Sequence, residues 1–300
     1  MTVDLAVVVI AYNSEHVLAG LLDSLPAALG DVRAQVLVVD NGSTDGSVAA
    51  LRARSDCQVI ASTNTGYSGG INTGVRHAEA DIPILILNPD ARLRPGAVPA
   101  LLAGLDHPGI GIVAPQVRDD QDRLHLSLRR EPSIPRAMGL TKTRLPLFSE
   151  YIYEPEAYRQ PGIVAWALGA ALLISRASYD ALGGWDESYF LYSEETDFCL
   201  RAADRGFLTR YEPTAVVEHI GAQSGQSAAT HTMQVINRVR LYARRHGALA
   251  GWTYYLVSLL NEASRIPRGG RGRSVTAVRA LLSPQRRPVE LGCSDRLLPS

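Results

Sequence analysis

Apolar runs alternate with amphipathic stretches along the first hundred residues of the chain. The runs suit strands buried on both faces of a sheet, at Val3–Ala11, Gln35–Val39, Val59–Ile60 and Ile84–Leu87. Ser14 can cap a first helix, whose apolar face is formed by Val17, Leu18, Leu21, Leu22 and Leu25. Further helices are expected over Ser47–Arg54, after the glycine-rich stretch 64–74 up to about Glu79, and over Ala97–Leu105. This rhythm predicts an α/β fold with a doubly wound, mostly parallel sheet and helices on both faces.

The pattern changes after Val117. Residues 118–162 are polar and rich in proline, which is typical of a flexible loop or an inserted binding region. Order returns with an apolar stretch at 163–175, a helix from Glu194 to about Arg205 and an extended run that ends at His219. We expect a catalytic unit over 1–232, with halves 1–117 and 118–232, followed by an extension over 233–300.

Charge is distributed unevenly along the chain. The net charge is zero, but from Met233 onward twelve arginines face three acids, a net charge of +9. Aromatic and leucine side chains alternate with these arginines, which predicts basic helices that lie on an anionic membrane. The alternative is that they pack on the catalytic unit or form a homodimer interface, with the last thirty or so residues disordered. No motif that reads nucleic acid accompanies the arginines, so nucleic acid is not expected as a partner.

Location is suggested by three features. The first apolar run follows Asp4 rather than basic residues, so a strand is expected there and not a signal peptide. No apolar stretch reaches the roughly 18 residues of a membrane span. The cysteines, Cys57, Cys199 and Cys293, are scattered and odd in number, which favours a reducing compartment. We therefore expect a cytoplasmic protein, with peripheral attachment to the inner face of the plasma membrane.

Polar residues follow several of the predicted strands. Parallel strands end at one edge of the sheet, where ligands bind, so Ala11, Asp40, Asn64 and Asp90 should gather there. Asp40 could accept a hydrogen bond from the imide N–H of uracil or thymine, or merely cap the next helix. Asp90 suits Mg²⁺ or Mn²⁺ on a diphosphate, or merely ends its strand. The glycine-rich stretch 64–74 allows close approach of backbone to a ligand.

Three acids stand at the start of a predicted helix, Glu194, Glu195 and Asp197. The helix dipole favours acids at this position, which is one explanation for them. The other is a general base, because aromatic neighbours would partly desolvate a carboxylate and raise its pKa. His219 is either a metal ligand or a core histidine.

The joint pattern resembles the inverting family-2 glycosyltransferases of the GT-A fold, and most closely their rhamnosyltransferase-like branch. The segments that carry the resemblance appear in family order over about 220 residues: 9–13, 38–46, 64–67 with 72–74, 87–90, 169–170 with Arg176, 184–187 with 189–190, 194–197 with Arg201, and His219.

The resemblance implies a role for each of these positions. Asp40 would hold the base of a nucleotide-diphosphate sugar, with Ala11, Tyr12 and Asn13 lining the nucleoside pocket and Asn64, Gly66 and Asn72 closing it. Asp90, with His219, would bind the divalent cation, Mg²⁺ or Mn²⁺, beside Asn88. Glu195 would be the general base, and Glu194 and Asp197 would shape its pocket. On the acceptor side would lie Gly169 together with Trp166, Trp185 and Tyr189, and the rings of these three aromatic residues could stack on sugars.

Two positions depart from the family pattern. Asn88 replaces the first acid of the Asp-x-Asp motif, which predicts a weaker metal site. Glu195 stands where many relatives have aspartate, so the choice between Glu194 and Glu195 stays open. The expected function is transfer of L-rhamnose from dTDP-rhamnose, or of a hexose from a UDP-sugar, to a glycan or lipid-linked acceptor in cell-envelope synthesis. The alternatives are a non-catalytic sugar-nucleotide-binding or scaffold protein and a nucleotidyltransferase of related topology.

Overall fold

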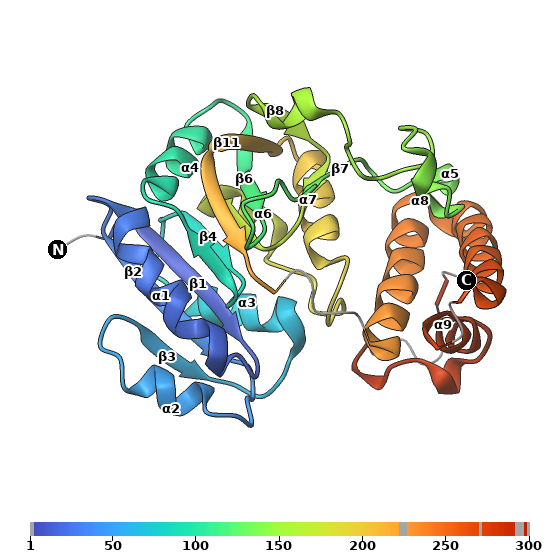
Figure 1. The fold of residues 1–300 in the computed structure, drawn as a ribbon, viewed down its shortest axis with the longest axis horizontal. Helices are drawn as coiled ribbons and strands as arrows, with labels where there is room; N and C mark the ends of the chain where they lie inside the picture. The colour runs from blue at the N-terminus through green and yellow to red at the C-terminus, as the bar shows by residue number, and fades with distance from the viewer. Residues whose placement is uncertain (1–2, 222–226, 270–271, 292–296, 299–300) are drawn as a thin grey trace.

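A central sheet organises the protein in a computed structural model that describes residues 3–221, 227–269, 272–291 and 297–298. Its strand order is β3-β2-β1-β4-β10-β6-β11-β5, with β8 paired to β11 (Figure 1). The first four strands in the chain, β1 (Leu5–Ala11), β2 (Ala34–Asp40), β3 (Gln58–Ala61) and β4 (Ile84–Leu87), are all parallel. The predicted parallel sheet is therefore confirmed in the first half of the chain.

Antiparallel strands enter in the second half. β10 (Ala171–Ile174) lies between β4 and β6 (Ile110–Arg118) and is antiparallel to both. β11 (Leu208–His219) runs parallel to β6 and antiparallel to β5 (Ala91–Leu93) and β8 (Gly162–Val164). Because β5 directly follows β4, this pairing brings His219 opposite Ala91 and next to the end of β4.

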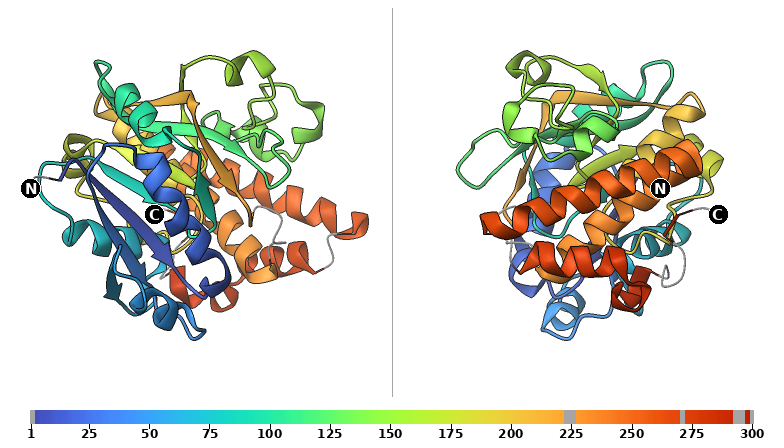
Figure 2. Two further views of the ribbon diagram at one scale, coloured as in Figure 1. Left: turned by 60° about the vertical axis from the view of Figure 1, so that its left-hand side comes forward. Right: turned by 90° about the vertical axis from the view of Figure 1, so that its right-hand side faces the viewer.

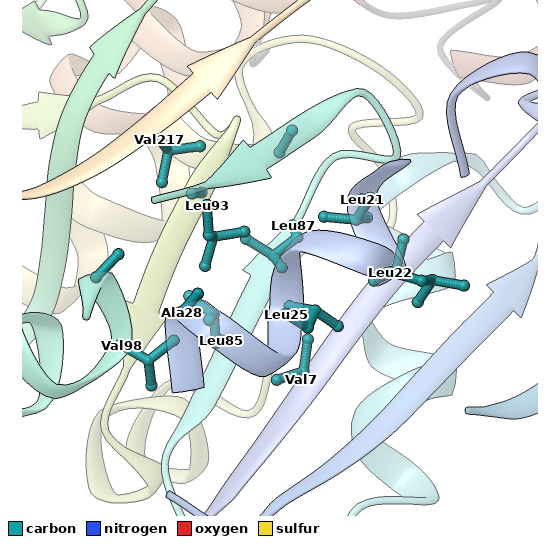
Figure 3. Close-up of a cluster of buried hydrophobic side chains, with 14 of the residues drawn as sticks. Val7, Leu21, Leu22, Leu25, Ala28, Leu85, Leu87, Leu93, Val98 and Val217 are labelled. Atoms are coloured by element: carbon teal, nitrogen blue, oxygen red, sulfur yellow. The ribbon is translucent and has the colours of Figure 1, made fainter. Parts of the chain in front are cut away.

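The sheet is covered by helices on both faces, because its central strands β1, β4 and β10 are apolar at every position. Odd-numbered residues of β1, such as Val7 and Val9, pack against α1 (Glu15–Leu29), and α4 (Ala97–Leu105) packs in the same layer (Figure 3). Even-numbered Val8 and Ile10 face α3 (Gly66–Arg76) in the opposite layer, which also receives α6 (Arg176–Leu182) and α7 (Glu194–Asp204). The short α2 (Ser47–Arg52) adds Leu51 to the first layer.

Ser14 precedes α1 as predicted, but its side chain does not cap the helix. Its hydroxyl accepts a hydrogen bond from the Tyr12 amide at 3.2 Å, while its own amide donates to Ser47 Oγ at 2.9 Å. The hydroxyl thus orders the turn after β1, and the backbone amide of Ser14 links that turn to the start of α2.

The polar segment 118–162 contains short elements rather than a structureless loop. They are β7 (Leu128–Arg129), which pairs with β9 (Trp166–Ala167), α5 (Ile134–Ala137) and the 3₁₀ turns η1 (Thr141–Thr143) and η2 (Pro155–Tyr158). The Arg129 guanidinium lies 3.8 Å from the centre of the Tyr151 ring. Buried cation–π contacts of this kind and the short sheet explain why the segment is ordered.

The basic extension is helical. α8 (Ala228–Arg265) and α9 (Arg273–Leu282) pack against each other at the opposite end of the molecule from β2 and β3 (Figures 1 and 2). The turn η3 (Ile266–Arg268) lies between them, and the turns η4 (Pro284–Arg286) and η5 (Val289–Leu291) follow α9. The expected boundary at 232/233 falls inside α8. The expected disorder of the last thirty residues does not hold for 272–291, because Ala280 and Leu281 are buried against α8; residues 292–296 and 299–300 lie outside the described residues.

Gly247 interrupts α8. Its φ of 82° and ψ of −179° are not helical, so α8 consists of two helical halves that fold back on each other. Tyr242 of the first half stacks on Tyr254 of the second, with ring centres 4.3 Å apart. Such dihedral angles are accessible almost only to glycine. Within the described residues, no helix combines the length and the apolar character that crossing a bilayer requires.

Candidate active site

A cleft of about 890 Å³ opens at the carboxyl-terminal edge of the parallel strands. Its walls come from the segments after β1, β2, β3 and β4, and the start of α8 closes the other side. Predicted site residues on the wall are Tyr12, Asn13, Asn64, Gly66, Asn88 and Asp90. Ala11 is not among them, because it is fully buried in the core beneath α1. The volume suits a small-molecule ligand.

Asp40 ends β2 with an unusual carboxylate. The side chain is 4% exposed, Oδ2 accepts a hydrogen bond from the Ser43 amide at 3.3 Å, and Oδ1 is buried without a partner among the described residues. It does not cap the following helix, because Asp45 binds the Ser47 amide there at 3.0 Å. A buried acceptor without a donor is costly, which favours a ligand that brings an N–H group.

Asn41, next to Asp40, fixes the loop that leads into α3. Its amide donates to Gly66 O at 2.9 Å and to Asn64 Oδ1 at 3.2 Å, and its carbonyl oxygen accepts from the Thr65 amide at 3.2 Å. Sequence reasoning assigned Asn41 no role of its own. A short polar side chain directly after a strand-end acid was the available signal.

Gly66 has a φ of 78° and lies directly against Phe190. A β-carbon at this position would lie 2.4 Å from Phe190 O, and the Tyr67 amide donates to the same oxygen at 2.8 Å. The loop that leads into α3 therefore touches the loop that precedes α7, and only glycine allows this approach.

Asn72 takes a role different from the expected one. Its amide nitrogen donates to Trp185 O and Glu187 Oε1, both at 2.9 Å, and its oxygen accepts from the Trp185 amide at 3.0 Å and from Tyr179 OH at 2.9 Å. These bonds use all the hydrogen-bonding capacity of the side chain. Asn72 therefore holds the 184–187 turn against α3 and does not face the cleft.

Asp90 and His219 meet at the corner of the cleft although they are far apart in sequence. Asp90 Oδ1 lies 3.2 Å from His219 Nε2, and Asn88 Nδ2 lies 3.4 Å from the same nitrogen. Burial alone would raise the pKa of Asp90, but the hydrogen bond and charge of His219 outweigh it and keep that pKa below its usual range.

This corner fits a divalent cation only with help from a ligand. Among the described residues no group of three or more His, Cys, Asp or Glu side chains could hold a metal alone. One carboxylate, one imidazole and the Asn88 amide are a sparse set. Mg²⁺ and similar hard cations are often held this way, by one or two carboxylates together with phosphate oxygens of the substrate.

Tyr67 connects the corner formed by Asn88, Asp90 and His219 to the start of α7. Its hydroxyl donates to Asn88 Oδ1 at 2.7 Å and lies 3.3 Å from Gly169 O. A β-carbon on Gly169 would lie 3.6 Å from Glu195 Cβ, so this glycine borders the predicted base. Burial, followed by the charges of Glu194, Glu195 and Asp90, raises the pKa of Tyr67 and keeps it a hydrogen-bond donor.

α7 begins at Glu194 after a strained turn. Tyr192 and Ser193 have φ angles of 67° and 73°, in the left-handed region that non-glycine residues rarely adopt. The buried Asn237 of α8 compensates, since its amide donates to Leu191 O and Tyr192 O, both at 3.0 Å. The extension therefore holds the loop that presents the acids.

Glu194 and Glu195 are both desolvated, and their environments differ. Burial raises the pKa of both carboxyl groups, and the charge of Glu195 raises that of Glu194 further. The positive charges of Arg238 and Arg129 oppose the shift at Glu195. These two arginines give Glu195 a cationic environment, which suits a group that must ionise to act as a general base.

Asp197 is engaged in a structural ion pair. Its carboxylate accepts from Arg201 Nε at 2.6 Å, and Arg201 also donates to Leu182 O and Gly184 O. Asp197 therefore stabilises the junction of α6 and α7, and it does not shape the pocket of the base as expected.

The three aromatic side chains expected to stack on sugars are buried in the structure. Trp185 stacks on Phe198 with ring centres 4.7 Å apart, Trp166 donates to Arg130 O at 3.0 Å, and Tyr189 is 0% exposed. This corrects the expectation, because none of these rings presents a face to the cleft. Sequence alone could not separate a core aromatic from a sugar platform.

Comparison with known proteins was made on sequence and on structure. A family model described as glycosyl transferase family 2 matches residues 6–177. The N-acetylglucosaminyl-diphospho-decaprenol L-rhamnosyltransferase of Mycobacterium tuberculosis is 33% identical over 251 residues, which cover 77% of this chain and 81% of that protein. The rhamnosyltransferase WbbL of Escherichia coli is 24% identical, over 74% of this chain and 85% of its own length.

Solved structures share the fold. The mannosyltransferase PcManGT from Pyrobaculum calidifontis, in complex with GDP-Man and Mn²⁺, superposes with a TM-score of 0.57 at 18% identity over 97% of this chain and 85% of its own. GalNAc-T7 with UDP, GalNAc and Mn²⁺ gives a TM-score of 0.63 at 13% identity over 89% of this chain. This chain spans about half of GalNAc-T7, since the match covers 52% of that protein.

Proposed function

From the premise that this chain belongs to glycosyltransferase family 2, we propose that it transfers L-rhamnose from dTDP-rhamnose, or a hexose from a UDP-sugar, to a lipid-linked glycan acceptor. Family membership sets aside the nucleotidyltransferase and scaffold alternatives. The proposed donor and acceptor are supported by the rhamnosyltransferases among the relatives, one of which is named for a diphospho-decaprenol acceptor.

The observation that carries the proposal is that three groups lie at or beside one cleft. Asp90 lines the cleft and meets His219 at a corner suited to a diphosphate. Asp40, a buried acceptor for the base, is next to Asn41 on the cleft wall. Glu195 borders Gly169, whose carbonyl oxygen lies 3.3 Å from the hydroxyl of Tyr67 on the same wall. A donor held at the first two would place its anomeric carbon near the third.

The reaction we propose is a single displacement with inversion. Glu195 takes the proton of the acceptor hydroxyl as that oxygen forms a bond to the anomeric carbon. The bond from that carbon to the diphosphate oxygen breaks on the opposite side, and the nucleoside diphosphate leaves with the electron pair. A divalent cation held by Asp90 and His219 would offset the charge that builds up on this leaving group.

Thermal stabilisation by nucleotides tests the donor. We expect UDP and dTDP with Mn²⁺ to raise the melting temperature and CDP to raise it less, because cytosine N3 carries no proton for Asp40. A matching gain with dTDP-rhamnose should accompany transfer to a prenyl-diphosphate sugar. An equal effect of CDP would remove Asp40 from base recognition, and no effect of any nucleotide sugar would overturn the proposed function.

We also propose that the second half of α8 lies on an anionic membrane. Leu249, Trp252, Leu256 and Leu260 project from one side of it and are 85%, 52%, 51% and 68% exposed. The net charge of +9 from Met233 onward complements anionic lipid. An exposed apolar stripe in a basic segment is the pattern of interfacial helices.

Vesicle binding tests this surface. Replacing both Leu256 and Leu260 with serine should weaken binding to phosphatidylglycerol vesicles about tenfold or more, because each leucine loses its burial in the interface. Ile163→Ser, at a 54% exposed position on the catalytic unit, is the matched control and should leave binding unchanged. Unchanged binding in the double variant, or its conversion of a dimer into a monomer, would contradict membrane docking.

A further inference from the structure

A second, smaller pocket lies on the other side of α8 from the donor cleft. It has a volume of about 210 Å³ and is formed by α8 and the 136–141 segment. Thr230 and Met233 of α8 line the donor cleft, while His231, Gln234 and Arg238 line this pocket. The two hollows are therefore separated only by the first turns of one helix.

Positive charge dominates the lining of this pocket. Arg136, Arg238 and Arg265 all contribute, with Glu262 as the acid on the wall. Glu262 pairs with His231 at 3.0 Å and with Arg265 at 3.3 Å, and Arg238 is bound to Glu150 behind the wall. A guanidinium carries five N–H donors, so these partners leave capacity for an anionic ligand.

The rim of this pocket is apolar on its outer side. Ala137, Gly139 and Thr141 line the pocket, whereas the residues between them, Met138 and Leu140, point outward and are 48% and 41% exposed. Leu145 and Leu147, slightly further along the same segment, are 53% and 59% exposed. A polar, basic hollow beneath an apolar rim matches an anionic head group that carries a hydrocarbon chain.

The pocket also adjoins the predicted base. Arg238, on its wall, is one of the two arginines whose charges act on Glu195, and the other, Arg129, lies 3.8 Å from the ring of Tyr151, which also lines the pocket. A ligand bound here would therefore lie beside Arg238, one of the two cations that act on Glu195.

The geometry points to this pocket as the site for the phosphate or diphosphate of a prenyl-linked acceptor, with Arg265, Arg136 and Arg238 as its cationic partners. The inference rests on the proposed function, since it names the part of the acceptor that the enzyme grips away from the reacting hydroxyl. It assigns the pocket a ligand class, an amphiphilic phosphate ester.

Direct binding tests the inference without relying on catalysis. Calorimetry with farnesyl diphosphate, in the presence of saturating UDP and Mn²⁺ to fill the donor cleft, should show binding to the wild-type protein. Arg265→Gln should weaken it about tenfold, the cost of one charged contact. Arg268→Gln is the matched control. Arg268 is exposed, lies about one turn after Arg265 and is not part of the pocket lining, so the affinity of this variant for farnesyl diphosphate should stay within twofold of the wild-type value.

Two further ligands separate the sources of the phosphate. Farnesol should not bind, and inorganic diphosphate should bind more weakly than farnesyl diphosphate; equal affinity would show a simple anion site and overturn the lipid-linked ligand. Equal losses in the two arginine variants, or displacement of farnesyl diphosphate by UDP, would overturn the pocket itself. Because UDP binding is measured separately, failure here is distinguishable from failure of the proposed function.

Discussion

Replacing Glu195 with glutamine is expected to lower the rate of sugar transfer by a factor of about 10³, the range of a lost general base. The amide keeps the size of the side chain but cannot accept the proton of the acceptor hydroxyl. Donor affinity, measured by the UDP-induced shift in melting temperature, should stay unchanged, because Glu195 is not among the residues that line the cleft.

Glu194→Gln is the matched comparison for this variant. Glu194 is the neighbouring acid on the same helix turn, and burial together with the Glu195 charge raises its pKa further. We expect a smaller loss of rate than for Glu195→Gln. The reverse order would assign the base to Glu194, and transfer at the wild-type rate in both variants would remove the acids from the chemistry.

The pH profile of the wild-type enzyme should follow the raised pKa of Glu195. The base works only when ionised, so kcat/KM should fall as the pH drops through that raised pKa, above the ordinary value of 4.5.

The contribution of this carboxyl group to folding stability changes with pH in the opposite direction. A raised pKa in the folded state stabilises the fold fully below pH 4.5 and loses that contribution as the pH rises through the folded pKa. Loss of the charge in Glu195→Gln is therefore not expected to unfold the protein at neutral pH.

Replacing Asp90 with asparagine should remove the effect of metal on donor binding. The substitution deletes the one carboxylate at the His219 corner, so affinity for a UDP-sugar in Mn²⁺ should fall about 100-fold, at least the cost of losing an outer-shell partner. Without metal the variant and the wild-type protein should bind alike. The measurement is donor affinity with and without Mn²⁺.

Asn88→Asp provides the opposite change at the same corner. In the wild-type protein Asn88 Nδ2 lies 3.4 Å from His219 Nε2. The substitution would place a second carboxylate at this position and should tighten Mn²⁺ binding. A metal effect of wild-type size in Asp90→Asn would exclude Asp90 as a ligand. No gain in Asn88→Asp would show that the missing acid does not limit the site.

The elements around the cleft were predictable because parallel strands buried on both faces are continuous apolar runs. β1, β2 and β4 all follow that rule. The acids Asp40 and Asp90 were predictable as well, because each stands at or just after the end of such a strand. The insertion of β10 between β4 and β6 was not predictable, because an isolated four-residue apolar strand carries no information on its direction or partner.

Side-chain roles were harder to infer than positions. Asn72 and Trp185 fall in motifs that suggested ligand contacts, yet they bind each other through backbone and amide groups. Their orientation depends on how α3 packs against the 184–187 turn, a contact between residues more than a hundred positions apart. The meeting of Asp90 with His219 is of the same kind, since it follows from the pairing of β5 with β11.

The backbone conformation of Gly247 determines how the two halves of α8 are oriented relative to each other. The first half of α8 is fixed to the loop before α7 through Asn237, and the second half carries the exposed leucines. That second half has 18 residues from Ala248 to Arg265, about 27 Å of helix. A side chain at 247 would meet no neighbour, but it would disfavour the φ of 82°. Any residue other than glycine would therefore strain the reversal that holds the leucine-bearing half of α8 against the half fixed to the loop before α7.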